Sequence, residues 1–247
     1  MKIDYSVYLL SWKENSYFIC VYLIVTLIIS FLFYNSFFPM LVFMPIGIYA
    51  RKIYQKYKIR KRQNELYFQF KDMVQALAAS LSVGYAFENA FSDVYKEMKK
   101  TYGKTGMIVQ ELQMIIWDIQ NGKNIEDILQ EFGSRSGIRD IYNFAQLIAV
   151  SKRTGGNMVH IMKATAANIS QKAEVESEIT TLIAAKRYEQ RIMIGVPFLI
   201  IGYMRITNPS YISILYESLA GRFIMTVCLV ISLISVIWSK KIISIGV

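Results

Sequence analysis

The stretch "RTGGNMVHIM", residues 153–162, brings together the residue types of an anion-binding site and of a catalytic site. It contains a cation, Arg153, the glycine pair Gly155 and Gly156, and His160, the single histidine of the chain. Glycines that open a helix can present unpaired amide groups to a phosphate, and the positive end of the helix dipole strengthens this attraction. The same pattern is also typical of a turn between two helices.

The rest of the apparatus for either chemistry is missing from the surrounding sequence. A phosphate-binding P-loop needs a preceding strand, a longer glycine-bounded loop and a Lys followed by Ser or Thr, and none of these accompanies Gly155 and Gly156. His160 lacks a carboxylate to orient it and a nucleophile, and Ile161 stands where a phosphoacceptor histidine would have an acidic neighbour. We therefore expect a helix end, with Asn157 as the N-cap of the next helix. No catalytic residue, cofactor site or metal site is predicted.

Four uncharged apolar runs indicate a membrane protein. The chain of 247 residues is 54% apolar, which is high for a soluble protein of this size. One span needs about 20 residues, and the runs form one hairpin at each end of the chain. We predict spans over about residues 17–34, 37–50, 192–206 and 223–239. The second run is short and contains Pro39 and Pro45, so a re-entrant loop is an alternative there. A signal peptide is disfavoured because no small-residue cleavage site follows the first run.

Clustered cations predict the orientation of these spans. The segment 51–63, directly after the first hairpin, carries seven cations and no anion, and Lys240 and Lys241 follow the last run. The seven cations are Arg51, Lys52, Lys56, Lys58, Arg60, Lys61 and Arg62. The positive-inside tendency then places the central domain and both termini in the cytoplasm. Next to a span, such cations favour anionic membrane lipids as partners over nucleic acid.

The cysteines and the spans themselves add no chemistry. Cys20 and Cys228 lie inside opposite spans, where a free thiol behaves as a small apolar group. No second set of ligands has the spacing of a metal site. Transporters and channels usually carry ionisable residues within their spans. The predicted spans have no charge at their centres, so both functions are disfavoured.

The central segment 64–191 is predicted to be an all-helical domain of about six helices. It contains no proline, and its apolar residues recur at helical spacing. Gly84, Gly122 and Gly156 each follow one helix and precede another, at intervals of 38 and 34 residues, which favours a repeated helix-turn-helix unit. The fold class is therefore an all-α membrane protein, with a cytoplasmic helical bundle flanked by transmembrane hairpins at 1–50 and 192–247.

The last helix of this domain should connect directly to the membrane. From residue 158 to residue 191 the sequence consists of good helix formers with a narrow apolar stripe, and no strong breaker precedes Pro197. At 1.5 Å per residue, some thirty residues reach about 45 Å. Such a helix would act as a rigid strut that carries movements of the bundle into the next span.

Three segments together resemble the F-domain family of type II secretion systems, and among its branches the platform proteins of tight-adherence (Flp) pili, of the TadB type. The segments cover residues 70–91, 109–137 and 149–200, and the resemblance as a whole extends over about 66–201. The positions that match the family pattern are Gly84, Gly122, the "SRSG" segment at 134–137, Gly155, Gly156 and Pro197.

The resemblance implies a membrane platform without enzymatic activity of its own. It would lie in the plasma (inner) membrane and couple a cytoplasmic secretion ATPase to the extraction and assembly of pilin or pseudopilin subunits. It would work as a homo-oligomer or together with a paralogous platform protein. The candidate docking face consists of Glu126, Asp127, Glu131, Arg135 and Arg139. For each of these residues an ordinary solvated helix end is the plainer interpretation.

One further class of function remains as an alternative. A membrane sensor or receptor would bind a ligand outside the cell and signal through the helical domain. The outer segment at 205–222 is short for a ligand-binding domain, and the first hairpin leaves only a turn outside. We therefore favour the platform.

Overall fold

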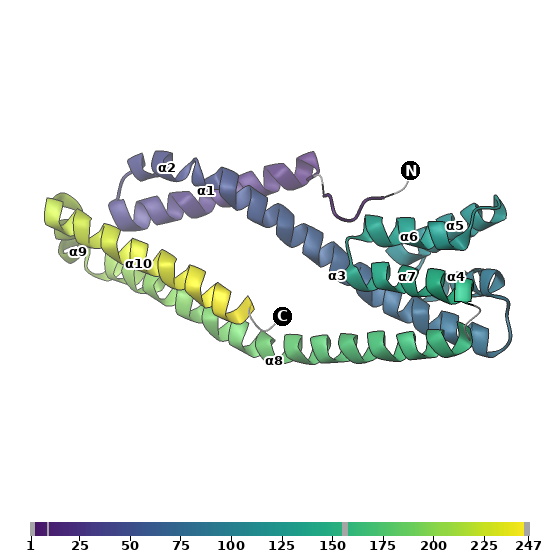
Figure 1. Cartoon of the computed structure of the whole chain (residues 1–247). Coiled ribbons are helices and arrows are strands. Elements are labelled where there is room, and N and C mark those ends of the chain that lie inside the picture. Colours follow the sequence, from purple (N-terminus) through teal and green to yellow (C-terminus); the bar gives the residue numbers. More distant parts are fainter. Residues whose placement is uncertain (1–2, 9, 155–157, 245–247) are drawn as a thin grey trace. The chain divides into compact units, whose positions relative to one another are not determined.

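The computed structural model of the chain describes residues 3–8, 10–154 and 158–244, and in these residues it contains helices and no strands (Figure 1). The helices are α1 (Trp12–Tyr34), α2 (Phe38–Phe43), α3 (Ile46–Ser82), α4 (Phe87–Tyr102), α5 (Met107–Gln120), α6 (Ile125–Ser136), α7 (Arg139–Thr154), α8 (Met158–Thr207), α9 (Pro209–Glu217) and α10 (Leu219–Ser244). The predicted all-α class is confirmed.

The chain divides into two compact units. The bundle consists of Met1–Leu9 and Gln55–Val175, and the hydrophobic unit consists of Leu10–Tyr54 and Glu176–Val247. Two helices, α3 and α8, contribute residues to both units. Residues 176–191 belong to the hydrophobic unit, although the sequence predicts them in the central domain.

The core of the bundle is built from one face of α3 and the helices that pack on it. A stripe of buried residues extends along α3, with one residue every three or four positions, as one face of a helix requires. It consists of Leu66, Phe70, Met73, Leu77 and Leu81. The Phe70 ring at the centre meets Phe144 edge to face and Phe132 at a tilt. The centroid of the Phe70 ring is 5.3 Å from that of Phe144 on α7 and 6.4 Å from that of Phe132 on α6. Each such burial contributes about 1.5–3 kcal/mol to folding.

Glycines end two of the bundle helices where the sequence predicts turns. Gly84 follows the end of α3 with φ of 101°, and Gly122 follows the end of α5 with φ of 76°. Both values lie in the left-handed region, where a Cβ atom would be strained. Gly155, Gly156 and the predicted N-cap Asn157 lie outside the described residues. The helices on either side of them end at Thr154 and begin at Met158.

The "SRSG" segment forms the tight connection between α6 and α7. Gly137 has φ of 65° and caps α6, and Ser136 donates its hydroxyl hydrogen to the Gly133 carbonyl at 2.7 Å. The same hydroxyl oxygen accepts the amide hydrogen of Ile138 at 3.1 Å. Gly133 also faces the backbone of the next helix, because a Cβ atom added to it would lie only 2.9 Å from the Tyr142 Cα atom. The absence of a side chain at Gly133 is therefore what lets α6 and α7 approach so closely.

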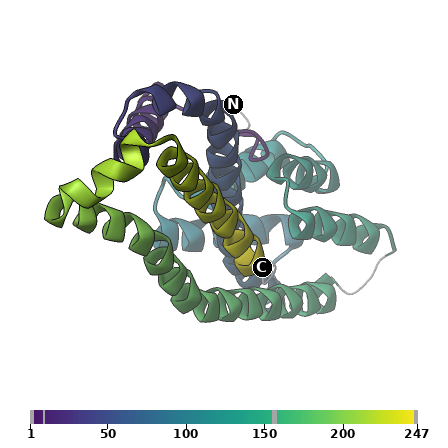
Figure 2. The same cartoon turned by 90° about the vertical axis from the view of Figure 1, so that its left-hand side faces the viewer.

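Two helices of the hydrophobic unit are long and apolar enough to cross a membrane. They are Trp12–Tyr34 and Leu219–Ser239. A third span results if the bent pair α8 and α9, with an angle of 112° between them, is counted as one. Figure 2 shows the chain turning from α8 through α9 into α10. Pro197 lies within α8.

The second apolar run, 37–50, does not form one helix in the structure. It is divided between α2, which ends at Phe43, and α3, which begins at Ile46. Pro45 lies at the break, where its missing amide hydrogen interrupts helical hydrogen bonding. Whether this run crosses the bilayer or re-enters it stays a prediction.

We predict that Gly133→Val destabilises the bundle by about 1–3 kcal/mol, because the added side chain must displace the backbone of α7. The matched control is Ser134→Val, which places the same residue at the exposed neighbouring position. The measurement is the free energy of unfolding of the detergent-solubilised chain, followed by circular dichroism. Equal losses in the two variants would show that the close approach of α6 and α7 is unimportant.

Candidate functional site

Where the structure describes the stretch 153–162, its residues pack within the bundle or form ion pairs. Arg153 lies in the last turn of α7, and its guanidinium Nε is 3.6 Å from Oε2 of Glu126. His160 is exposed in the first turn of α8. Within the described residues, no group of three His, Cys, Asp or Glu side chains is placed to hold a metal ion.

The five predicted docking residues lie on α6 and at the start of α7, but they do not share one exposed face. They are Glu126, Asp127, Glu131, Arg135 and Arg139. Asp127 and Arg139 are exposed, whereas the other three are partly buried and form ion pairs within the bundle. The structure thus divides the predicted set into two residues that face solvent and three that form ion pairs, of which those of Glu126 and Arg135 join different helices.

Arg135 forms a bidentate ion pair inside the bundle. Its Nη1 and Nη2 atoms donate to the two carboxylate oxygens of Glu111 on α5, at 3.1 and 2.8 Å. The Glu111 side chain is fully buried, and that of Arg135 is 17% exposed. A second carboxylate, Glu131, lies 3.5 Å from the Nε atom. Burial alone would lower the pKa of the Arg135 guanidinium, but the hydrogen bonds and charge of Glu111 outweigh it and raise that pKa.

The same arginine fastens the N-terminal segment to the bundle. Residues 3–8, which we call the N-terminal strap, precede α1 and belong to the bundle. Nη1 of Arg135 donates to the Ile3 carbonyl at 2.7 Å, and the Arg135 carbonyl accepts the Tyr5 amide hydrogen at 2.9 Å. Gln55 of α3 donates to the Tyr8 carbonyl at 2.6 Å. The strap is therefore held through its backbone at three points.

Tyr5 anchors the strap by burial of its side chain. The ring is fully buried, and the guanidinium of Arg62 lies 4.5 Å from its centroid in a cation–π contact. Burial, with the neighbouring Glu111 carboxylate, raises the pKa of the Tyr5 phenol. A neutral phenol avoids placing a second negative charge beside the buried carboxylate of Glu111.

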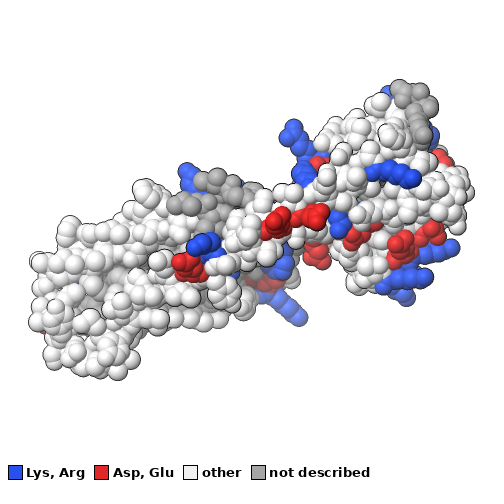
Figure 3. All heavy atoms as spheres, turned by 90° about the horizontal axis from the view of Figure 1, so that it is seen from below, with Lys and Arg blue, Asp and Glu red and all other residues white. Residues whose placement is uncertain are grey.

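The predicted lipid-facing cations lie on three successive turns of α3. Five of the seven are exposed: Arg51, Lys52, Lys56, Arg60 and Lys61. Arg62 is directed onto Tyr5 instead, and Lys58 is half-buried with an interaction partner of its own. Each exposed cation near an anionic membrane surface contributes about 1 kcal/mol of attraction. In Figure 3, charged side chains gather on part of the visible face and are sparse on the rest of it.

A polar cluster closes the end of α1 within the hydrophobic unit. Arg205 of α8 donates to the Phe31 carbonyl and, at 2.5 Å, to the side-chain oxygen of Asn35, the left-handed C-cap residue of α1. Its guanidinium also stacks over the Phe31 ring at 3.7 Å. Tyr216 of α9 donates its hydroxyl hydrogen to the Leu32 carbonyl at 2.6 Å. Two of the last four carbonyls of α1, those of Phe31 and Leu32, thus find partners in α8 and α9.

Comparison with known proteins gives one family assignment. Residues 73–205 match the family described as "Type II secretion system (T2SS), protein F". The matched region begins in α3 and ends near the end of α8, so it includes the ion pair between Glu111 and Arg135. No curated protein and no solved structure matches the chain.

We predict that Arg135→Ala destabilises the bundle by about 3–5 kcal/mol, because Glu111 is left as an unpaired buried charge. The exposed residue Arg139 provides the matched control, and Arg139→Ala should change stability by less than about 0.5 kcal/mol. The double variant Glu111→Leu with Arg135→Met should recover most of the loss, since neither charge is then buried. Chemical denaturation of the purified chain measures all three, and a double variant as unstable as Arg135→Ala would contradict the explanation.

Proposed function

Because the chain belongs to the protein F family of type II secretion systems, whose members are inner-membrane platforms of secretion and pilus machines, we propose that it is the platform of a pilus of the tight-adherence (Flp) type. A cytoplasmic secretion ATPase would bind the bundle, and pilin or pseudopilin subunits would be extracted from the bilayer beside the hydrophobic unit. The platform would act as a homo-oligomer or together with a paralogous platform protein.

The observation that carries this proposal is the continuity of the helices between the two units. Helix α3 extends from Ile46 to Ser82 and α8 from Met158 to Thr207, and each has one part in the bundle and one in the hydrophobic unit. Every residue in the interior of a helix is tied to its neighbours by backbone hydrogen bonds, so a helix resists bending far more than a loop of the same length. A push on the bundle would therefore reach the membrane through α3 and α8.

The N-terminal strap supplies a third connection. It is fixed to α5 and α6 through the pair of Glu111 and Arg135, and it leads into α1, which begins at Trp12. In the proposed mechanism, α1 would respond to the bundle together with α3 and α8. The bundle itself would move as one body, because its helices are joined by buried rings and a buried ion pair.

The proposed topology follows from the positions of the cations in the sequence. The bundle, the basic segment 51–63 and both termini would lie in the cytoplasm, with hairpins at 1–50 and 192–247 in the membrane. The exposed cations of α3 would rest on anionic head groups. Asp127 and Arg139, which are exposed on α6 and α7, would take part in docking the ATPase.

We predict that exchanging the charges at the docking face, Asp127→Lys with Arg139→Glu, weakens co-purification with the secretion ATPase of the same cell about tenfold, which corresponds to about 1.4 kcal/mol. Stability should change little, because both side chains are exposed. Lys104→Glu, a charge reversal at another exposed position of the bundle, is the control. If the double variant retains the ATPase as well as Lys104→Glu does, the docking face lies elsewhere.

We predict that Leu182→Pro stops pilus assembly, because a proline inside α8 removes a helical hydrogen bond and costs about 3 kcal/mol locally. Leu182 is 69% exposed, so the substitution disturbs little packing, and Leu182→Ala is the matched control. The measurements are the amount of surface pilin and the amount of ATPase retained on the membrane. Normal pilus numbers with Leu182→Pro would contradict transmission through α8.

A further inference from the structure

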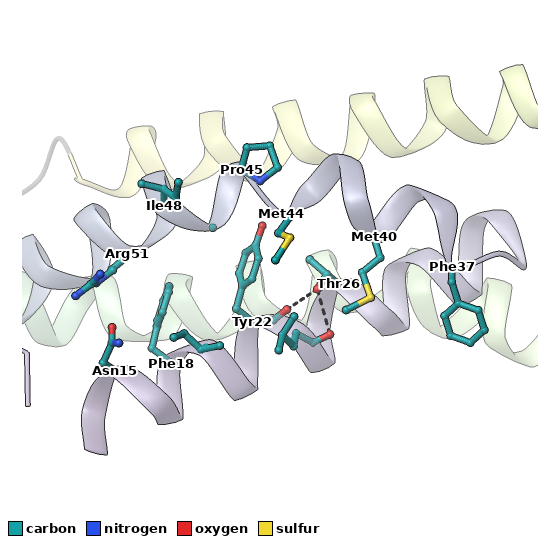
Figure 4. Close-up of a pocket in the computed structure, with 13 residues that line it drawn as sticks. Asn15, Phe18, Tyr22, Thr26, Phe37, Met40, Met44, Pro45, Ile48 and Arg51 are labelled. Carbon is teal, nitrogen blue, oxygen red and sulfur yellow. Dashed lines mark hydrogen bonds between the residues drawn. The ribbon is translucent and has the colours of Figure 1, made fainter. Parts of the chain in front are cut away.

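An elongated apolar groove lies within the hydrophobic unit, between α1 and the segment formed by α2 and the start of α3 (Figure 4). Its volume is about 790 Å³. Phe18, Tyr22 and Thr26 of α1 line one wall, and Met40 and Met44 line the opposite one. Flexible methionine side chains suit a surface that must adapt to an irregular apolar guest.

The polar atoms along the walls of the groove already have partners. Tyr22 donates its hydroxyl hydrogen to the Phe43 carbonyl at 2.5 Å, and Thr26 donates to the Tyr22 carbonyl at 2.8 Å. Gly47 lets the start of α3 approach the Tyr22 ring, because a Cβ atom there would lie 2.9 Å from it. Since these donors and acceptors are satisfied, the body of the groove offers a guest hydrocarbon contacts rather than hydrogen bonds.

One end of the groove is polar and positively charged. Arg51 of α3 and Asn15 of α1 line it there, and Figure 4 shows their side chains next to each other at that end. The Asn15 Oδ1 atom is buried and accepts no hydrogen bond from the part of the chain that the structure describes. A buried acceptor of this kind costs free energy unless a donor reaches it. A guest that brings a negative charge for Arg51 and a hydroxyl for Asn15 would satisfy both residues.

The position of this end fits the level of lipid head groups. Asn15 is three residues from the start of α1, and Trp12, at that start, is 91% exposed. Tryptophan and arginine are both enriched at the boundary between membrane and water. If α1 crosses the bilayer, the charged end of the groove lies at a membrane surface and its apolar body extends into the hydrocarbon.

The length of the groove and the charge at one end favour a lipid as its occupant. From Asn15 to Thr26 the groove follows α1 for about 16 Å, close to the roughly 15 Å of hydrocarbon in one leaflet. The cation at one end of the groove and the apolar body beyond it match the charged head group and the hydrocarbon chain of a phospholipid. An acyl chain is narrow enough to enter.

We propose that this groove binds one anionic phospholipid with a hydroxylated head group, of the phosphatidylglycerol type. Its phosphate pairs with Arg51, a head-group hydroxyl donates to Asn15, and one acyl chain lies against Met40, Met44 and Tyr22. The inference requires that α1 crosses the membrane and does not depend on the proposed coupling to an ATPase.

Native mass spectrometry of the purified full-length chain, titrated with phosphatidylglycerol or phosphatidylethanolamine in detergent, tests the site. The wild-type chain should retain one phosphatidylglycerol, and Arg51→Gln should weaken that binding about tenfold. Lys104→Gln is the matched control, because Lys104 is an exposed cation of the bundle that does not line the groove, and it should bind as the wild type does. Equal weakening in both variants, or equal retention of phosphatidylethanolamine, would overturn the proposal.

A second variant separates the groove from surface charge. Met44→Trp keeps Arg51 and fills the apolar body, so it should lose the bound lipid while circular dichroism shows an unchanged helix content. A photo-crosslinking residue at position 44, activated in native membranes, should yield a lipid adduct. Retention of the lipid by Met44→Trp would show that the lipid binds outside the groove and would overturn the proposal. A protein adduct in place of a lipid adduct would show that the groove has a different occupant.

Discussion

A carboxylate without access to water, that of Glu111, is held within the bundle by the guanidinium of Arg135. This pair is costly to break, since either charge alone would be buried without compensation. It joins α5 to α6, and through the Ile3 carbonyl it also joins both helices to the segment that leads into α1. The attachment of the N-terminal strap, and with it one of the three proposed routes from the bundle to the membrane, depends on this interaction.

The bundle and the hydrophobic unit are built from two different kinds of helix. Helices of the bundle bury one face against phenylalanine rings and keep their charges for solvent and for each other. Helices of the hydrophobic unit expose Val, Ile and Leu on nearly every side, which is stable only in a lipid environment. Helices α3 and α8 combine both patterns along their length, and the proposed transmission of movement rests on this feature.

Local sequence signals predict much of this architecture. The uncharged runs predict α1 and α10, helical spacing predicts the faces of the bundle, and glycines at 84 and 122 stand where α3 and α5 end. Long-range contacts leave no such signal. Arg135 has an acid at helical spacing, Glu131, so it resembles a surface residue, whereas its main partner Glu111 lies 24 residues earlier. Tyr5 precedes a span and resembles a loop residue, because nothing local shows that its ring is buried. The groove depends in the same way on Gly47, whose contact with Tyr22 joins two helices.

The cluster around Arg205 defines where movement can occur. Because α8 is fastened to the final turn of α1 by a guanidinium that holds both a carbonyl and a helix cap, these two helices cannot slide past each other at that end without breaking charged hydrogen bonds. A force applied to the opposite end of α8 would then tilt it, with Arg205 as the fulcrum. The displacement of each residue of α8 would then grow with its distance along the helix from Arg205.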